Sequence, residues 1–140
     1  MLNAPFAELQ YEPTVDMFLA GLDTEYQGRE FKDEILKLDP NSKVGRAEII
    51  KKYIIKRQEH LSYRHKFLLF KKLECALLNE DYDFSTAFEY DYEANEPSSS
   101  PWSASEIDTP RSFFEDIFSI AKDVWSVDVS KATMEDSSAW

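Results

Sequence analysis

Hydrophobic residues in the first third of the chain repeat at the spacing of an amphipathic helix. One face is formed by Val15, Phe18, Leu19, Leu22 and Tyr26, which fall at i, i+3, i+4, i+7 and i+11. A second group with the same spacing comprises Phe31, Ile35 and Leu38. The sequence Asp-Pro-Asn-Ser at 39–42 follows and is typical of a chain that stops one helix and starts another. This region therefore predicts two short helices.

The next segment, 42–78, contains no proline and no glycine after Gly45. Its apolar residues recur every three, four or seven positions, at Ala47, Ile50, Ile54, Leu61, Leu68 and Cys75. The pattern predicts one long central helix inside 44–79, or two helices with a break near His60. From Phe67 to Leu78 the segment is apolar nearly all round, so we expect this end to be the most buried.

A different pattern begins after residue 80. Residues 80–110 contain nine acidic side chains and no lysine or arginine. Aromatic residues alternate here with acidic ones: Phe84, Phe88, Tyr90 and Tyr92 share one parity, and Glu89, Asp91 and Glu93 the other. Alternation with period two is typical of a half-exposed strand or an extended arm. We therefore expect a short strand or hairpin near 84–92 or a loop, which leaves an α+β fold as the alternative to a mainly α fold.

The last strong element is predicted over 110–126. Thr109 is a candidate N-cap, and Pro110 suits the first helical position. A broad apolar stripe follows, with Glu115, Asp116 and Asp123 opposite it. Beyond Val129 the residues are small and polar. The sequence thus predicts a mainly α, compact helical domain over 1–127 and a loose C-terminal tail over 128–140.

Composition and charge restrict the function. The 140 residues include 27 acidic and 16 basic side chains, a net charge of -11, and 43% of the residues are hydrophobic, enough for a real core. Such a charge repels nucleic acid and anionic lipid and attracts basic proteins. Cys75 is the single cysteine, and the first residues lack the charge and apolar run of a secretory signal. We expect a cytoplasmic protein with no membrane-spanning segment.

Residues suited to catalysis are scarce. His60 and His65 are five positions apart, whereas helical metal pairs prefer four. Carboxylate pairs such as Glu115 and Asp116 are abundant, but nothing in the pattern places one in an apolar pocket, which acid–base catalysis would require. No phosphate-binding loop, dinucleotide fingerprint or serine-nucleophile motif is present. We therefore expect no enzyme activity, no cofactor and no metal site, and an enzyme that uses the acidic cluster with a metal is the less favoured alternative.

Charge is strongly segregated along the chain. The net charge is -5 over 1–45, +7 over 46–72 and -13 over 73–140. The basic residues between 51 and 72 have two interpretations. They either neutralise the acidic segments that pack beside them, or form a nucleic-acid or adaptor surface with thin aromatic support from Tyr53 and Tyr63. The acidic total favours the first interpretation.

The acidic-aromatic region is the candidate partner-binding site. Tyrosine and tryptophan combine apolar area with a polar tip, as interface anchors do, and carboxylates around them would attract a partner rich in lysine and arginine. The aromatic candidates are Tyr82, Tyr90, Tyr92 and Trp102. The acidic candidates are Glu89, Asp91, Glu93, Glu96, Glu106, Asp108, Glu115 and Asp116.

The segment SPWSASEIDTPRSFFEDIFSIAKDVWS, residues 100–126, resembles C-terminal segments of immunity proteins from contact-dependent growth inhibition and colicin-type systems. The resemblance implies a protein that binds one cognate toxin domain, often a nuclease, and blocks its active site or substrate surface. It carries over no binding residue, since each such pair uses its own contacts. An immunity-type inhibitor of a basic toxin is thus the first functional hypothesis. A helical adaptor that binds protein or nucleic acid through 51–72 is the second.

Overall fold

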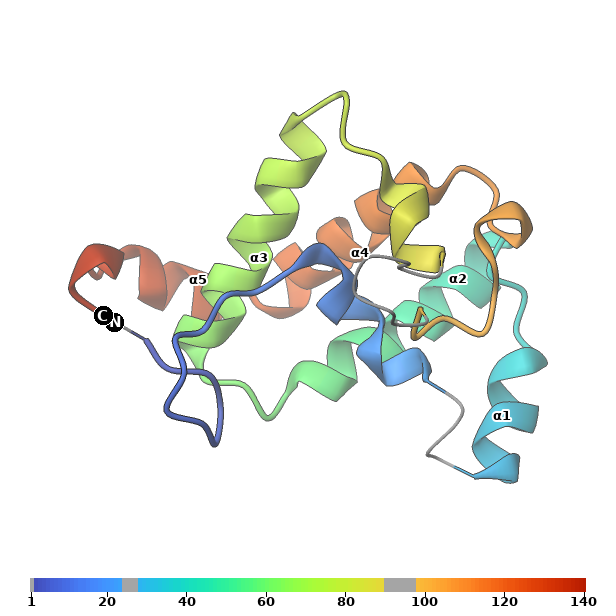
Figure 1. Ribbon diagram of the computed structural model, residues 1–140, viewed down its shortest axis with the longest axis horizontal. Coiled ribbons are helices and arrows are strands. Elements are labelled where there is room, and N and C mark those ends of the chain that lie inside the picture. Colours follow the sequence, from blue (N-terminus) through green and yellow to red (C-terminus); the bar gives the residue numbers. More distant parts are fainter. Residues whose placement is uncertain (1, 24–27, 90–97) are drawn as a thin grey trace.

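A computed structural model describes residues 2–23, 28–89 and 98–140. The chain is mainly α-helical, as the spacing of its apolar residues predicts (Figure 1). Within the described residues, β pairing is limited to one isolated bridge between Asn3 and Gln10. In chain order the elements are η1 (Val15–Leu22), α1 (Arg29–Leu36), α2 (Lys43–Ile49), η2 (Ile50–Ile55), η3 (Lys56–Gln58), α3 (Tyr63–Leu78), η4 (Phe84–Phe88), η5 (Ala104–Glu106), α4 (Pro110–Val124), α5 (Ser126–Thr133) and η6 (Ser137–Ala139).

The predicted central helix is divided in two. The first part is a continuous helical run in which α2 passes into the wider π turns of η2 and then into the 3₁₀ turn η3. The chain leaves this run after Gln58, and α3 starts at Tyr63. Ser62 caps α3, because its Oγ accepts a hydrogen bond from the backbone N of His65 at 3.3 Å. The alternative with a break near His60 is therefore confirmed.

The core lies where α3 and α4 pack together with η1 and η2. Aromatic pairs join these elements across long sequence distances. Phe70 of α3 stacks on Phe118 of α4 with ring centroids 4.8 Å apart, and Phe18 of η1 stacks near Trp125 at 6.2 Å. The apolar stripe that predicted a helix over 110–126 is the buried face of α4. Thr109 precedes that helix with a positive φ of 48°, and its side chain does not cap it.

The strand expected near 84–92 is not formed in the part that the structure describes. Residues Phe84–Phe88 form the 3₁₀ helix η4, which starts where Asp83 Oδ1 accepts a hydrogen bond from the backbone N of Ser85 at 3.0 Å. Phe84 and Phe88 stand at the two ends of this short helix, and both side chains are buried in the core. Residues 90–92 lie outside the described residues.

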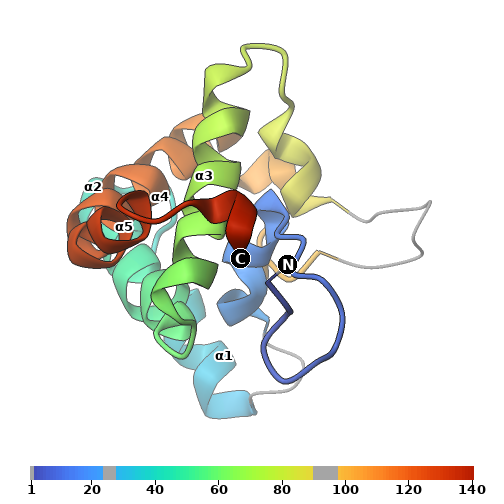
Figure 2. The ribbon, with the colours of Figure 1, turned by 90° about the vertical axis from the view of Figure 1, so that its left-hand side faces the viewer.

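The C-terminal residues differ from the loose tail predicted over 128–140. They include α5, whose Ala132 is buried, and the segment crosses in front of α3 in Figure 2. The polar residues of this segment find partners on α3: Lys66 pairs with Asp128 at 3.0 Å, and Arg64 pairs with Glu135 at 2.9 Å. These ion pairs connect the C-terminal segment to α3. The low hydrophobicity of the segment gives no indication of them in the sequence.

Candidate partner-binding surface

Three segments meet at one end of the molecule, in the upper right of Figure 1: residues 79–89, residues 98–109 and the first turns of α4. A cluster of phenylalanine rings holds them together. Phe84 lies 5.1 Å from Phe114, and Phe88 lies 5.6 Å from Phe113, measured between ring centroids. We call this region the acidic end, because these segments carry the exposed carboxylates of Glu80, Asp81, Asp83, Glu89, Glu106, Asp108, Glu115 and Asp116.

Arg111 is the single lysine or arginine in the sequence from 79 to 116, and its charge is directed inward. Its guanidinium donates to the carbonyl of Leu77 at 2.6 Å and to that of Asn79 at 3.3 Å. It also covers the ring of Phe84, 5.1 Å from the centroid. These carbonyls end α3 and have no helical donor, so a cation there is favourable. The arginine thus joins α3 to α4 and leaves the outer carboxylates without a neutralising partner on these segments.

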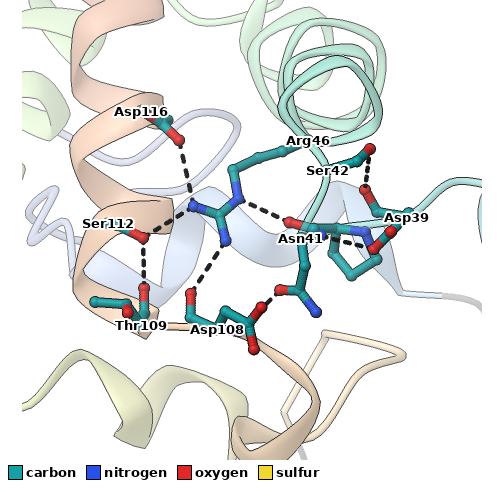
Figure 3. A network of polar contacts seen from close by, with 9 residues as sticks. Asp39, Asn41, Ser42, Arg46, Asp108, Thr109, Ser112 and Asp116 are labelled. Atoms are coloured by element: carbon teal, nitrogen blue, oxygen red, sulfur yellow. Dashed lines mark hydrogen bonds and ion pairs between the residues drawn. The ribbon is translucent and has the colours of Figure 1, made fainter.

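Arg46 of α2 fixes the backbone that presents the acidic residues (Figure 3). Its side chain is buried, and each nitrogen has a partner. Nε donates to the carbonyl of Pro40 at 2.7 Å, one terminal nitrogen donates to Ser112 Oγ at 2.9 Å, and the other donates to the carbonyl of Asp108 at 3.1 Å. The nitrogen that binds Ser112 also lies 3.3 Å from Asp116 Oδ2. A buried charge with this many acceptors is stable, whereas an unpaired one is strongly unfavourable.

Asn41 adds a second clamp on the same loop. Its Nδ2 donates to the carbonyl of Glu106 at 2.8 Å, and its Oδ1 accepts from the backbone N of Asp108 at 2.8 Å. Glu106 Oε1 in turn accepts a hydrogen bond from the backbone N of Ser103 at 3.0 Å. The loop that carries Glu106 and Asp108 is therefore held through its backbone, and the Asp108 carboxylate remains exposed.

The sequence-predicted site residues have different outcomes. Glu89, Glu106, Asp108, Glu115 and Asp116 are exposed at the acidic end, and Tyr82 lies exposed beside them, with its ring 4.6 Å from Phe84. The structure therefore brings together six predicted residues from three segments. The remaining candidates Tyr90, Asp91, Tyr92, Glu93 and Glu96 lie outside the described residues.

Trp102 does not have the exposed position that an interface anchor needs. Its side chain is 7% exposed and belongs to the hydrophobic core. The Ser100 hydroxyl donates to its carbonyl at 2.9 Å and accepts from its backbone N at 3.1 Å, so the chain turns at this point and directs the indole inward. The prediction of Trp102 as a partner-binding residue was wrong, because the loop packs its largest apolar side chain against the core.

Electrostatics at the acidic end favour a cationic partner. The pKa of the Tyr82 phenol is raised, first by burial and then by the negative charges of Asp16 and Asp83. Asp16 belongs to η1, so a carboxylate from the acidic region 1–45 also raises the pKa of this tyrosine. A cation placed next to Tyr82 would meet negative potential from two parts of the chain.

Several cations of the basic segment, residues 46–72, are paired with acidic side chains of the protein itself. Lys52 lies 3.5 Å from Glu34 of α1, in the acidic region 1–45. Arg64 and Lys66 form ion pairs with carboxylates in the acidic region 73–140. These contacts support the interpretation that the segment neutralises the fold's own acid. The cations without an ion pair among the described residues are Lys51, Lys56, Arg57 and Lys72.

Sequence reasoning missed Arg46 as the residue that organises the surface. The sequence shows it only as the first cation of the basic segment, and its burial depends on carbonyls that come from residues 40 and 108. In the sequence, Arg46 stands between Gly45 and Ala47, three positions before the apolar pair Ile49 and Ile50. No local pattern distinguishes such an arginine from a solvated one.

Two further observations concern metal binding and membrane insertion. In the ranges 2–23, 28–89 and 98–140, no group of three or more histidine, cysteine or acidic side chains is placed to hold a metal ion. None of the helices in these ranges combines the length and apolar character needed to cross a membrane.

Comparison with known proteins gave no relative. No protein-family model matches the chain, and neither a curated protein nor a solved structure matches it at a significant level. The function therefore has to be inferred from the residues and their arrangement.

Proposed function

We propose that this protein is an immunity-type inhibitor that binds a basic toxin domain, of which a nuclease is the leading type, through its acidic end. The observation that carries the proposal is the arrangement of charge at this end. Its carboxylates point outward, while the cations near them, Arg46 and Arg111, are directed inward and bind carbonyl groups. Most carboxylates of this end are therefore left open to a cationic partner.

The scaffold under this charge is fixed before any partner arrives. Arg46 and Asn41 clamp the loop from 106 to 108, and the phenylalanine cluster holds η4 against α4. A preorganised surface loses less conformational freedom on binding, which favours tight association. Carboxylates on such a surface would occupy the site where a nuclease binds phosphate, and they would also speed the encounter with the enzyme. Function in the cytoplasm, without cofactor or catalysis, belongs to this proposal.

The test is protection of cells from a toxin. The first toxin to examine is any secreted protein with a toxin-like C-terminal domain that is encoded next to this chain. Cells that express the toxin domain should survive only when this protein is co-expressed, and the two purified proteins should elute as an equimolar complex. A folded protein that neither protects nor forms a complex with the neighbouring toxin domain would contradict the proposal.

The location of the interface is tested with an acidic-end variant that combines Glu89→Lys, Asp108→Lys and Glu115→Lys. These three side chains are exposed and form no ion pair or side-chain hydrogen bond within the described residues. The variant should remain folded and lose protection. If it protects as well as the natural protein, the acidic end is not the interface.

A distant control variant separates local from overall charge. It combines Glu8→Lys, Glu12→Lys and Asp33→Lys, which are exposed on the N-terminal segment and α1 and change the net charge by the same amount. This control should still protect. Equal loss of protection in both variants would show that total charge, and not the acidic end, determines binding.

A further inference from the structure

A groove runs along α3 where the two ends of the chain meet. Figures 1 and 2 show the N-terminal segment and the C-terminal residues side by side next to this helix. The groove has a volume of about 600 Å³, within the ordinary range for small-molecule sites. Its lining comprises Leu2, Gln10, Tyr11, Pro13, Leu68, Lys71, Lys72, Cys75, Ser137, Ser138 and Trp140. It is separate from the acidic end.

Specific contacts hold both walls of the groove. On the N-terminal side, His65 Nε2 donates to the carbonyl of Asn3 at 2.7 Å, and the His65 ring meets Tyr11 edge-on at 4.8 Å. On the C-terminal side, Trp140 packs edge-on against Phe67 with ring centroids 5.7 Å apart. Its indole Nε1 also donates to Glu135 at 3.1 Å. The aromatic side chains Tyr11 and Trp140 are thus placed against α3 before any ligand binds.

The charge of the groove is unusual for this protein. Acidic side chains outnumber basic ones by 27 to 16 in the chain, yet the lining contains two lysines and no aspartate or glutamate. Lys71 is already engaged with Glu74 at 2.9 Å and with the ring of Phe67. Lys72 is exposed and has no ion pair in the part of the chain that the structure describes. A free ammonium group therefore stands beside apolar and aromatic surface.

We propose that this groove binds a small organic anion with an apolar body, such as an alkyl or aromatic carboxylate. Lys72 would bind the anionic head group. Leu68, Pro13, Tyr11 and Trp140 would cover the body, and the hydroxyl of Ser137 offers a further donor to the head group. A neutral ligand would leave Lys72 unused, and a cation would be repelled by its ammonium group. This inference does not rest on the proposed toxin inhibition, since it uses other residues.

Cys75 gives a direct readout of occupancy. It is the single cysteine of the chain, it is exposed, and it lies in the groove one turn after Lys71 and Lys72. The experiment measures the rate at which iodoacetamide alkylates Cys75 in the natural protein. Decanoate and decylammonium, both below their micelle-forming concentrations, serve as probes because they share one apolar body and have opposite charges. Decanoate should slow alkylation in a saturable manner, and decylammonium should not.

Two matched variants assign the effect to the groove. Lys72→Glu should weaken protection by decanoate about tenfold, because it replaces an attraction by a repulsion. Lys51→Glu makes the same charge change on an exposed lysine outside this groove and should leave protection unchanged. Circular dichroism confirms that both variants fold. The proposal is overturned if decanoate gives no protection, if decylammonium protects equally, or if Lys72→Glu and Lys51→Glu behave alike.

Discussion

Arg46 and Asp116 are 70 positions apart in the sequence and form an ion pair of 3.3 Å in which only the arginine is buried. The Arg46 side chain is 10% exposed, and that of Asp116 is 54% exposed. The two residues therefore have unequal importance for stability. Arg46 also satisfies the carbonyls of Pro40 and Asp108, whereas the carboxylate of Asp116 can be solvated by water if its partner is removed.

We expect Arg46→Met to lower the free energy of unfolding by about 2–4 kcal/mol, because it leaves buried acceptors without donors. Asp116→Asn should lower it by less than about 1 kcal/mol, as is usual for an exposed partner. Urea unfolding followed by far-ultraviolet circular dichroism measures both values. Equal losses in the two variants would mean that the ion pair, and not the set of backbone acceptors, gives Arg46 its role.

Trp102 and Tyr82 were both candidate anchors of an interface, but Trp102 is buried and Tyr82 is exposed. Trp102→Ala should destabilise the fold by about 3–5 kcal/mol, because the indole is almost fully buried. Tyr82→Ala should lower stability by about 1 kcal/mol, the contribution of its ring contact with Phe84. Thermal and urea unfolding test the difference. A Trp102→Ala protein as stable as the natural one would show that the indole does not belong to the core.

The contact between Glu135 and α3 predicts a dependence of stability on pH. Hydrogen bonds from Tyr63, together with Arg64 and Trp140, hold the pKa of the Glu135 carboxyl below its usual range. Because the folded pKa is below the unfolded value, the contribution of Glu135 is fully present above the unfolded pKa. It is lost as pH falls through the folded pKa.

Glu135→Gln isolates this contribution. The natural protein should be more stable than the variant at neutral pH, and the difference should decrease as the solution is acidified below the ordinary glutamate pKa. Thermal unfolding over a pH series measures it. Asp136 has a pKa that is lowered by hydrogen bonds from Ser138, so Asp136→Asn serves as the neighbouring comparison. A difference between natural and Glu135→Gln proteins that does not change with pH would exclude the carboxylate as its source.

The sequence predicts the helices best where one apolar face is long. The stripe over 110–126 appears as α4, and the break expected near His60 separates η3 from α3. The segment at 84–88 could not be assigned from its pattern, because Phe84 and Phe88 satisfy both a period of two and a helical spacing of four. The structure has a 3₁₀ helix there, and its two phenylalanine rings pack against Phe113 and Phe114 of α4. Similarly, the polar residues after Val129 gave no sign that α3 supplies partners for them.

Exposure was harder to predict than helical structure. Glu89, Asp108 and Glu115 are exposed, as expected of carboxylates in an acidic chain, and their role in binding stays a prediction. The burial of Trp102 and Arg46 was not, because each depends on chain segments that are distant in sequence. The groove beside α3 was missed for the same reason, since it requires both termini.

Association kinetics give the sharpest test of the acidic end as the surface that meets a toxin. Once a toxin domain is identified, the acidic-end variant should bind it with an association rate at least about tenfold lower at low salt. Dissociation should change less, because these carboxylates are exposed and act mainly during encounter. The difference between the natural protein and the variant should shrink as ionic strength rises, since salt shortens the range of the attraction. Surface plasmon resonance or stopped-flow fluorescence at several salt concentrations measures both rates.

Tyr82→Ala and the distant control variant complete this test. Tyr82→Ala should act mainly through faster dissociation, by about 2 kcal/mol or more in binding free energy if the exposed ring is an anchor of the interface. The distant control variant should retain the natural association rate apart from a small effect of total charge. If the control loses as much association rate as the acidic-end variant at every salt concentration, the partner responds to the overall field of the protein. In that case the interface lies elsewhere, and the ordered carboxylates around Arg46 serve the fold and not the recognition of a toxin.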